Sequence, residues 1–431
     1  MNRRIVAATL CLFALSSAAF ADPPETNYDE SKIAPYVLPD PLIANDGTRV
    51  TDVVTWESKR RPEIVKLFED HVYGKTPGSA LPGMHSVVTE ESKDALGGKA
   101  TRRQVTLYFT ADEKGPCMDL LVYLPNAVTG PVPAFVGLNF YGNQTVHADP
   151  AIAINPRWMR GNKEIGIENN RATEKTRGVY THRWQVEKLI DNGFALVTAC
   201  YGDIDPDSYD DNFSDGVHPL FYAAGQTRPA DTEWGSIGAW AWGLSRAMDY
   251  VETVDAIDAK HVAIIGHSRL GKAALWAGAQ DTRFALVISN DSGCGGAALY
   301  RRDYGEQVHH MVEGPIGYWF CKAHYKYARK ERELPVDQHE LIALMAPRPV
   351  YVASAVEDPW ADPKGEFLST LNANPVYKVY GKIGLPATEM PSIDTPVMGD
   401  LAYHVRTGEH DVLEYDWDQY IAFAKMHFGR P

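Results

Sequence analysis

The stretch with the clearest chemical potential is GHSRLGK, residues 266–272, because it places a serine, an arginine and a lysine within five positions. Ser268 follows the apolar run HVAIIG and precedes the helix-forming run RLGKAALWAGA. A serine on a sharp turn between a strand and a helix projects its hydroxyl above the sheet, and the first helical N–H groups point at any oxyanion formed there. The arrangement favours a nucleophile; a serine that only caps a helix in a binding domain is the alternative.

Two cations accompany this serine. Arg269 directly follows it, where a guanidinium would stabilise an oxyanion, and Lys272 lies four residues after it on the same helical face. Two adjacent cations repel each other unless an anion or carboxylates balance their charge, so pairing with nearby acids is the alternative role. The usual G-x-S-x-G pattern of α/β-hydrolases is altered here, because Leu270 takes the place of the second glycine and Gly271 comes one position later.

A histidine near the C-terminus fits the role of a general base. His410 lies in the loop before the last predicted helix, as the order serine, acid, histidine of α/β-hydrolases requires, and His404 is a rival six residues earlier. A carboxylate would hold the histidine tautomer and stabilise the imidazolium. Four carboxylates follow apolar, strand-like runs: Asp291, Glu357, Asp358 and Asp362. Each has the alternative of capping a loop turn, which is the commoner fate of Asp.

The elements that must position these residues alternate between strands and helices from Cys117 onward. Several apolar runs without a polar face are typical of strands buried on both sides, as in a parallel sheet: DLLVYLP, VPAFVGLN, FALVTACY, HVAIIG, FALVISN and PVYVASA. Helices are predicted over 186–192, 237–254, 269–279 and 417–428. This alternation predicts an α/β-hydrolase fold with a mostly parallel central sheet flanked by helices. The irregular stretches 155–182 and 300–332 are expected as inserted loops around the active site.

The N-terminus has the features of a secretory signal peptide, predicted over residues 1–21. Two arginines precede an apolar run, and Ala19-Phe20-Ala21 fits a cleavage site. The apolar run is too short to span a membrane, so we expect export to the periplasm or beyond and no membrane partner; a buried N-terminal helix is the alternative. Residues 22–431 are then expected to form a single catalytic domain, with residues 22–100 as an N-terminal extension packed on it.

Charge and cysteine content limit the possible partners. The formal net charge of −14 argues against nucleic acid, because phosphate binding needs a basic surface. Four cysteines remain after the predicted cleavage, and their spacing matches no zinc site: Cys117, Cys200, Cys294 and Cys321. Core thiols, or one or two incidental bridges, are expected. We expect a monomer that uses neither a metal nor another cofactor.

GHSRLGKAA resembles the G-C-S-R-x-G-K-x-A signature of the glucuronoyl esterases, carbohydrate esterase family 15. Seven further stretches are similar to blocks of bacterial members, and together they are specific: RRPEIVKLFEDHVYGKTP, GLNFYGNQTV, YGDIDPD, WGSIGAWAWGLSRAMDYVE, SNDSGCGGAALYRRDYGE, EDPWADPKGE and RTGEHD. The resemblance covers most of the mature chain. It implies an α/β-hydrolase that cleaves the ester between glucuronate, or 4-O-methylglucuronate, of glucuronoxylan and a lignin alcohol.

The resemblance also implies individual roles. Ser268 would be the nucleophile, His410 the base and Arg269 a member of the oxyanion hole. Three further side chains would meet the sugar, the first two by hydrogen bonds to uronate hydroxyls and the third by stacking on or flanking the ring: Lys272, Glu306 and Trp360.

The position of the triad acid varies in this family, and both known positions are occupied here, by Asp291 and Asp358. Asp291 is one methylene shorter than the glutamate common at its position. We therefore expect Asp358 to be the main partner of the histidine and Asp291 to assist. A second departure is His267, which stands where the family usually has a cysteine.

Two other functions remain open from the sequence. An acetyl or feruloyl esterase acting on xylan would use the same triad, but Lys272 and Glu306 would then have no sugar hydroxyls to bind. A catalytically inactive carbohydrate-binding protein on a hydrolase scaffold would not need Ser268 and His410, and their retention argues against it.

Overall fold

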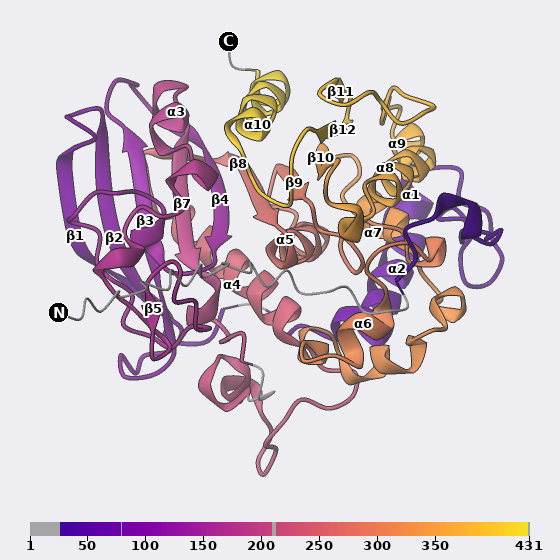
Figure 1. Ribbon diagram of the computed structural model, residues 1–431, viewed down its shortest axis with the longest axis horizontal. Helices are drawn as coiled ribbons and strands as arrows, with labels where there is room; N and C mark the ends of the chain where they lie inside the picture. Colours follow the sequence, from indigo (N-terminus) through magenta and orange to yellow (C-terminus); the bar gives the residue numbers. More distant parts are fainter. Residues whose placement is uncertain (1–25, 79, 209–212, 430–431) are drawn as a thin grey trace, which may run out of the picture.

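The computed structural model describes residues 26–78, 80–208 and 213–429, so the predicted signal peptide lies outside the described residues. The described chain folds around a ten-stranded sheet in the order β1-β2-β3-β7-β4-β8-β9-β10-β12-β11 (Figure 1). Within the run β7-β4-β8-β9-β10-β12, each pair of neighbouring strands is parallel. Antiparallel pairs form the two edges of the sheet. This architecture confirms the predicted mostly parallel α/β-hydrolase sheet.

The strands of the sheet have the following bounds: β1 His85–Ala95, β2 Ala100–Tyr108, β3 Cys117–Pro125, β4 Val132–Asn139, β7 Ala195–Cys200, β8 Ile257–His267, β9 Leu286–Asn290, β10 Val350–Ala355, β11 Val397–Met398 and β12 Leu401–Arg406. A separate hairpin pairs β5, Ile167–Glu168, with β6, Arg171–Ala172. The apolar run DLLVYLP lies in β3, which is antiparallel to both of its neighbours. Its apolar character therefore reflects burial on both faces and not the direction of pairing, which corrects the parallel reading of this run.

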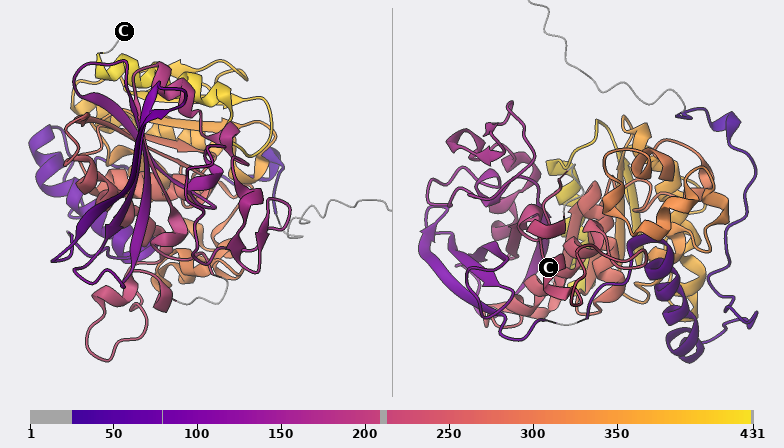
Figure 2. Two further views of the ribbon diagram at one scale, coloured as in Figure 1. Left: turned by 90° about the vertical axis from the view of Figure 1, so that its left-hand side faces the viewer. Right: turned by 90° about the horizontal axis from the view of Figure 1, so that it is seen from below.

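Helices cover both faces of the sheet (Figures 1 and 2). Successive strand residues point to opposite faces, and in β8 this sends Val262 and Ile264 into one hydrophobic cluster and Ala263 and Ile265 into another. The first cluster includes residues of α4 and α5, and the second includes residues of α3 and α10. The helices have the following bounds: α1 Val53–Thr55, α2 Arg61–Phe68, α3 Val186–Asp191, α4 Ser236–Val251, α5 Arg269–Gln280, α6 Val308–Val312, α7 Gln338–Ala343, α8 Pro363–Asn372, α9 Asn374–Val379 and α10 Glu414–Phe428.

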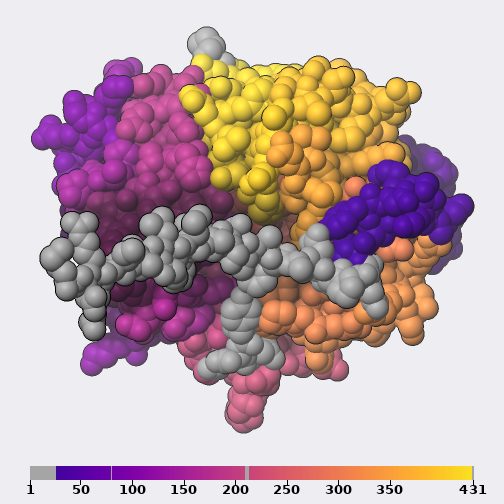
Figure 3. Space-filling model, viewed as in Figure 1, coloured from indigo at the N-terminus to yellow at the C-terminus, as the bar shows by residue number. Residues whose placement is uncertain are grey.

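The N-terminal part and the inserted loops complete the fold. Of the expected extension 22–100, residues 85–95 form β1 and residue 100 begins β2, so this part belongs to the sheet itself. The stretches 155–182 and 300–332 contain single turns of helix, the β5–β6 hairpin and the short α6. Figure 3 shows the N-terminal part of the described chain, in indigo, lying against the orange and yellow C-terminal half on one face, where Glu30 contacts Arg302 and Lys364. Segments distant in sequence therefore meet there at the surface.

Two whole-chain expectations can be compared with the described residues. Cys117 is partly buried, Cys200, Cys294 and Cys321 are buried, and all four are free thiols, so the core-thiol expectation holds and the incidental bridges are absent among them. Within the described part of the chain, none of the helices has the length and apolar character needed to cross a membrane.

Candidate active site

The elbow between β8 and α5 carries Ser268 in a strained backbone conformation. Its φ is 57° and its ψ is −131°, a sparsely populated region that costs about 1–3 kcal/mol for a residue with a side chain. The turn is tight enough that a Cβ at position 266 would lie 1.9 Å from the carbonyl oxygen of Leu270. The backbone N–H of Ser268 donates to the carbonyl of Asn290 at 2.9 Å, which ties the elbow to the end of β9.

The altered glycine spacing has a local explanation. A Cβ on Gly271 would lie 2.9 Å from the Cβ of Ser292 and 3.1 Å from the carbonyl oxygen of Gly266. Gly271 therefore lets the first turn of α5 pack directly against the loop after β9 and against the strand side of the elbow. Leu270 is 1% exposed and belongs to the hydrophobic core instead.

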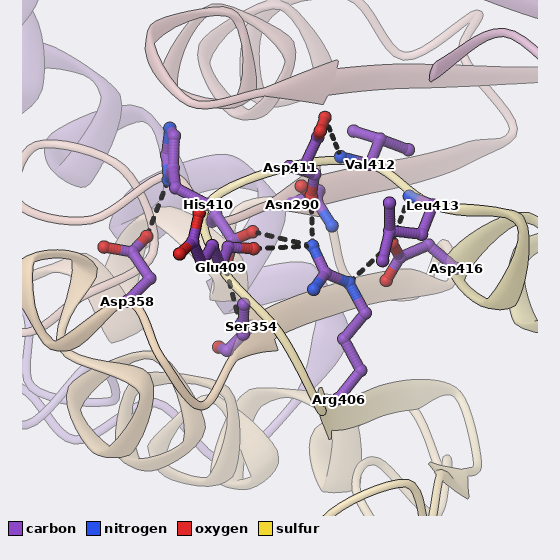
Figure 4. Close-up of polar contacts among 12 residues, drawn as sticks. Asn290, Ser354, Asp358, Arg406, Glu409, His410, Asp411, Val412, Leu413 and Asp416 are labelled. Carbon is purple, nitrogen blue, oxygen red and sulfur yellow. Dashed lines mark hydrogen bonds and ion pairs between the residues drawn. The ribbon is translucent and has the colours of Figure 1, made fainter. Parts of the chain in front are cut away.

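His410 and Asp358 come together at the carboxyl ends of neighbouring parallel strands. β10 and β12 pair in register up to Ala355 opposite Arg406, so the loops that follow these strands lie side by side. The Nδ1 of His410 donates to Oδ2 of Asp358 at 2.6 Å (Figure 4). Because Nδ1 carries the proton of this hydrogen bond, Nε2 of the neutral ring is left as a proton acceptor. The His410 side chain is 41% exposed, whereas that of Asp358 is 6% exposed.

The rival His404 lies elsewhere. Its side chain is fully buried, with Nδ1 2.9 Å from the hydroxyl of Tyr351 and Nε2 2.9 Å from Oδ1 of Asp416. Because both ring nitrogens have partners in the interior, His404 is not placed to act as the base that the sequence left as an alternative to His410.

Asp291 lies next to the His410–Asp358 pair. One ligand atom of each of these three residues lies within 4.8 Å of the others. Oδ1 of Asp291 accepts a hydrogen bond from the backbone N–H of Ala355 at 2.7 Å. Burial, together with the charges of Asp358 and Glu366, raises the pKa of Asp291 well above its usual range. The carboxylate hydrogen-bonded to the imidazole is thus that of Asp358, with Asp291 behind it.

The two other acids that follow β10 have different surroundings. Glu357 is exposed, and its backbone N–H donates to the carbonyl of Gly408 at 3.0 Å. Asp362 caps α8 through the N–H of Gly365 and forms an ion pair with Arg302 at 2.9 Å. Burial raises the pKa of Asp362 to about 6 although Arg302 opposes the shift. These contacts are structural.

Arg269 is fixed by an acid that sequence reasoning missed. Its Nη1 donates to Oδ2 of Asp207 at 2.7 Å, and its guanidinium lies over the rings of Phe140 and Trp319, 5.4 and 4.8 Å from their centroids. Burial alone would lower the pKa of Arg269, but the charge of Asp207 raises it above its ordinary value. The guanidinium beside Ser268 is therefore held both charged and oriented.

Asp207 is itself almost completely bonded. Four other side chains donate to its carboxylate: Tyr201 at 2.9 Å, Tyr318 at 2.5 Å, Trp319 at 2.9 Å and Arg160 at 3.0 Å. Burial would raise the pKa of Asp207, but Arg269 and Arg160 lower it below the usual value. The sequence offered only a weak signal, because Asp207 is the last of three aspartates in YGDIDPD, the stretch that follows the buried strand β7.

The three predicted sugar contacts form a connected group: Lys272, Glu306 and Trp360. Lys272 is 3% exposed. Its ammonium donates to the carbonyls of Ser292 and Cys294 and to Oε2 of Glu306, at 2.8, 2.7 and 2.8 Å. These three contacts use all its N–H donors. The backbone N–H of Glu306 donates to the carbonyl of Trp360 at 2.8 Å. The structure therefore brings the three predicted sugar contacts together, with Lys272 bonded internally.

His267 packs between the elbow and the base. Its ring centroid lies 4.5 Å from that of His410, and its Nδ1 lies 2.6 Å from Oδ1 of Asn290. The amide nitrogen of Asn290 donates to the Tyr420 hydroxyl, so Oδ1 is an acceptor and Nδ1 of His267 carries the proton. Burial lowers the pKa of His267 well below its usual range, which keeps the ring neutral beside His410.

Comparison with known proteins agrees with this geometry. Residues 185–381 match the family model described as glucuronyl esterase of fungi. The chain is 50% identical, over 95% of its length and 93% of the relative's, to the carbohydrate esterase MZ0003 of an unknown prokaryotic organism. It is 32% identical, over 80% of its length and 62% of the relative's, to the 4-O-methyl-glucuronoyl methylesterase 1 of Phanerochaete chrysosporium.

A solved structure extends this similarity to three dimensions. The glucuronoyl esterase from Solibacter usitatus superimposes with a TM-score of 0.87 at 48% sequence identity, covering 93% of this chain and 100% of that one. Together with the 50% identity over nearly the whole chain, this shows that the protein belongs to carbohydrate esterase family 15, the glucuronoyl esterases.

Proposed function

We propose that this protein is a serine esterase that hydrolyses the ester between glucuronate, or 4-O-methylglucuronate, of glucuronoxylan and a lignin alcohol. Family membership supports a carboxylic ester hydrolase acting on glucuronate esters. The observation that carries the assignment is the 2.6 Å hydrogen bond from His410 to Asp358, beside an elbow whose strained serine is followed by an anchored arginine.

The chemistry would be two-step acyl transfer. Nε2 of His410 takes the proton of the Ser268 hydroxyl as the oxygen attacks the C6 carbonyl of the uronate. Arg269 and the first N–H groups of α5 stabilise the oxyanion. The alcohol leaves with the proton from His410, and water then repeats the sequence to release the acid. Asp358 holds the imidazole tautomer and stabilises the imidazolium, with Asp291 assisting.

The sugar would be held by Lys272, Glu306 and Trp360. Because Lys272 already donates to Oε2 of Glu306, it orients that carboxylate and leaves Oε1 to accept from a uronate hydroxyl. Lys272 would reach the substrate itself by exchanging one of its carbonyl partners. Trp360, joined to Glu306 through the backbone, would stack on or flank the ring.

We further infer that residues 22–431 act as one catalytic unit, exported after removal of residues 1–21. The features of the N-terminal sequence support export, and the continuous ten-stranded sheet with β1 and β11 at its edges supports a single unit.

The assignment is tested with paired substrates. Wild-type protein should release acid from benzyl glucuronate much faster than from a simple acetyl ester, and Ser268→Ala should abolish this release while retaining uronate binding. A fluorophosphonate should label wild-type protein at Ser268. Faster hydrolysis of the acetyl ester would favour an acetyl xylan esterase, and sugar binding without labelling would indicate an inactive binding protein.

The choice of triad acid is tested with the same substrate. Asp358→Ala should lower kcat by about 10⁴-fold, the loss seen when a triad histidine loses its orienting acid. Asp291→Ala should cost less than tenfold, because Asp291 hydrogen-bonds to the backbone and not to His410. The reverse order would make Asp291 the main acid.

A further inference from the structure

The loop that carries His410 is held by contacts with its backbone. It spans residues 407–413, between the end of β12 and the start of α10. The His410 side chain is 41% exposed, and its described hydrogen bond goes to Asp358. Because little packs on the imidazole from outside, its position depends on how the backbone on either side of residue 410 is held.

A buried arginine holds that backbone from inside (Figure 4). Arg406, the last residue of β12, is 1% exposed. Its Nη2 donates to the carbonyl of Glu409 at 3.0 Å and to the carbonyl of Asp411 at 2.5 Å. Its Nη1 donates to the carbonyl of Thr407 at 3.1 Å. One guanidinium thus binds the carbonyl groups of the two residues on either side of His410.

The guanidinium is fixed in turn by the interior. Its Nε donates to Oδ2 of Asp416 at 2.8 Å, and Asp416 is fully buried in the first turn of α10. The same Oδ2 accepts from the N–H of Leu413, and Oδ1 lies 2.9 Å from Nε2 of His404. Asp416 therefore joins the start of α10, the strand β12 and the loop through one carboxylate.

Arg406 also faces the acid pair behind the imidazole. Its Nη2 lies 3.7 Å from Oδ2 of Asp291, which has no hydrogen-bond partner among the described residues. A positive charge at this distance favours the charged form of the Asp291 carboxyl and so opposes part of the rise in its pKa.

We propose that Arg406 is a positioning residue for the reaction: by binding the carbonyls of Glu409 and Asp411, it fixes His410 between Asp358 and the nucleophile. This inference rests on the proposed role of His410 as the base. A planar, five-donor guanidinium suits the task, because a lysine ammonium at its place has three donors on a shorter reach and cannot keep all of these contacts together.

Arg406→Lys tests the proposal without removing the charge. A displacement of the imidazole by about 1 Å is expected to lower kcat for benzyl glucuronate on the order of 10²-fold. KM should stay within about twofold, because the sugar contacts at Glu306 and Trp360 are untouched. The rate of fluorophosphonate labelling at Ser268 should fall in parallel, because it needs the same base.

Arg60→Met is the matched control. Arg60 is 4% exposed and donates to Glu340 at 2.9 Å and to the carbonyl of Pro41, so it is another buried arginine that joins a carboxylate to the backbone. Its loss should lower the melting temperature but leave kcat and the labelling rate unchanged below that temperature. Should Arg406→Lys not fold, Asp416→Asn carries the test, with a fall in kcat of roughly tenfold and an unchanged KM expected.

The outcomes separate the two proposals. If wild-type protein hydrolyses benzyl glucuronate and Arg406→Lys matches Arg60→Met in kcat and labelling, the role of Arg406 is refuted. If KM of Arg406→Lys rises while kcat is retained, Arg406 supports substrate binding and not the base, and the positioning role is also refuted. If wild-type protein is labelled but does not cleave glucuronate esters, the substrate assignment fails, and slower labelling of Arg406→Lys still supports the positioning role.

Discussion

At the scale of single residues, the proposed oxyanion arginine depends on one buried carboxylate. Asp207 accepts a hydrogen bond from Arg269 on Oδ2 and from Arg160 on Oδ1. Three neutral side chains also donate to it: Tyr201, Tyr318 and Trp319. A guanidinium aimed at a developing oxyanion lowers the barrier only if it is already in place when charge develops. Asp207, buried and bonded through both of its oxygens, therefore holds Arg269 in one orientation.

We expect Asp207→Asn to lower kcat for benzyl glucuronate by roughly tenfold, less than the ~10²–10³-fold expected for Arg269→Ala, because the arginine remains but is held by a weaker, neutral acceptor. Steady-state kinetics of the two variants measure this. The control is Asp203→Asn, since Asp203 is a buried acid of the same loop that pairs with Arg157 and not with Arg269. Equal kcat values for wild type and Asp207→Asn would contradict the orienting role.

At this scale the sequence predicted the candidate reactive residues and the pairing of His410 with Asp358, but not the partners of Arg269 and Lys272. Ser268, Arg269, His410 and Asp358 stand out because each follows a strand or begins a helix, and chain order assigns their roles. Asp207 has the same local pattern as many loop acids, and only the folded chain brings it to Arg269. The internal bonding of Lys272 was also hidden, because its carbonyl partners are backbone groups about twenty residues away.

At the scale of elements, the elbow is held because the first turn of α5 is in direct contact with the loop after β9 and with the end of β8. The first turn of this helix approaches Ser292 so closely that Gly271 has no space for a side chain. The helix N-terminus is thereby fixed relative to β8 and β9, the strands that precede Ser268 and Asp291. The position of the hydroxyl is set by this packing as much as by the turn itself.

Gly271→Ala should therefore displace the elbow. A Cβ 2.9 Å from that of Ser292 forces the helix and the loop apart, so we expect a loss of about 1–3 kcal/mol in the free energy of unfolding and a fall in kcat. Gly278→Ala is the comparison, because Gly278 lies on the same helix against the side chain of Val287, far from the elbow. Urea denaturation should show both variants weakened, whereas only Gly271→Ala should lose kcat.

The sequence predicted six strands of the described sheet (β3, β4, β7, β8, β9 and β10) and the helices α3, α4, α5 and α10. One missed strand and one misread strand have physical causes. The strand β12 was missed because its run LAYHVR includes His404 and Arg406, which are rarely buried in a strand. Both are buried here because Asp416 bonds to each of them. A strand of this kind is recognisable only once the acid on the following helix is placed beside it. The antiparallel direction of β3 could likewise not be predicted, because a strand buried on both faces has the same apolar sequence pattern in either direction.

At the scale of the whole molecule, buried carboxylates connect the layers around the site. Glu366 on α8 is fully buried and accepts from the backbone N–H groups of Ser292 and Gly293 and from the hydroxyl of Ser354. It thus joins α8, β10 and the loop after β9. Burial raises its pKa to about 8, although the hydrogen bonds from Ser354 and Gly293 oppose the shift.

This pKa makes folding stability depend on pH. A carboxyl group whose pKa is higher in the folded than in the unfolded chain contributes its full stability below the unfolded value of 4.5 and loses it as the pH rises through about 8. Glu366→Gln mimics the protonated form and does not titrate. The free energy of unfolding of wild type relative to this variant should therefore fall between pH 4.5 and 8, which chemical denaturation at several pH values measures. A difference independent of pH would contradict the raised pKa.

The unbridged thiols have a practical consequence for producing this protein. Cys117, Cys200, Cys294 and Cys321 form no crosslink, and burial raises the pKa of each one, so they resist becoming reactive thiolates. The proposed signal peptide would deliver the chain to an oxidising compartment, but the unbridged arrangement of these four thiols needs no oxidoreductase to join sulfur atoms. Residues 22–431 expressed in the reducing bacterial cytosol should reach the native fold, with a melting temperature that dithiothreitol does not change.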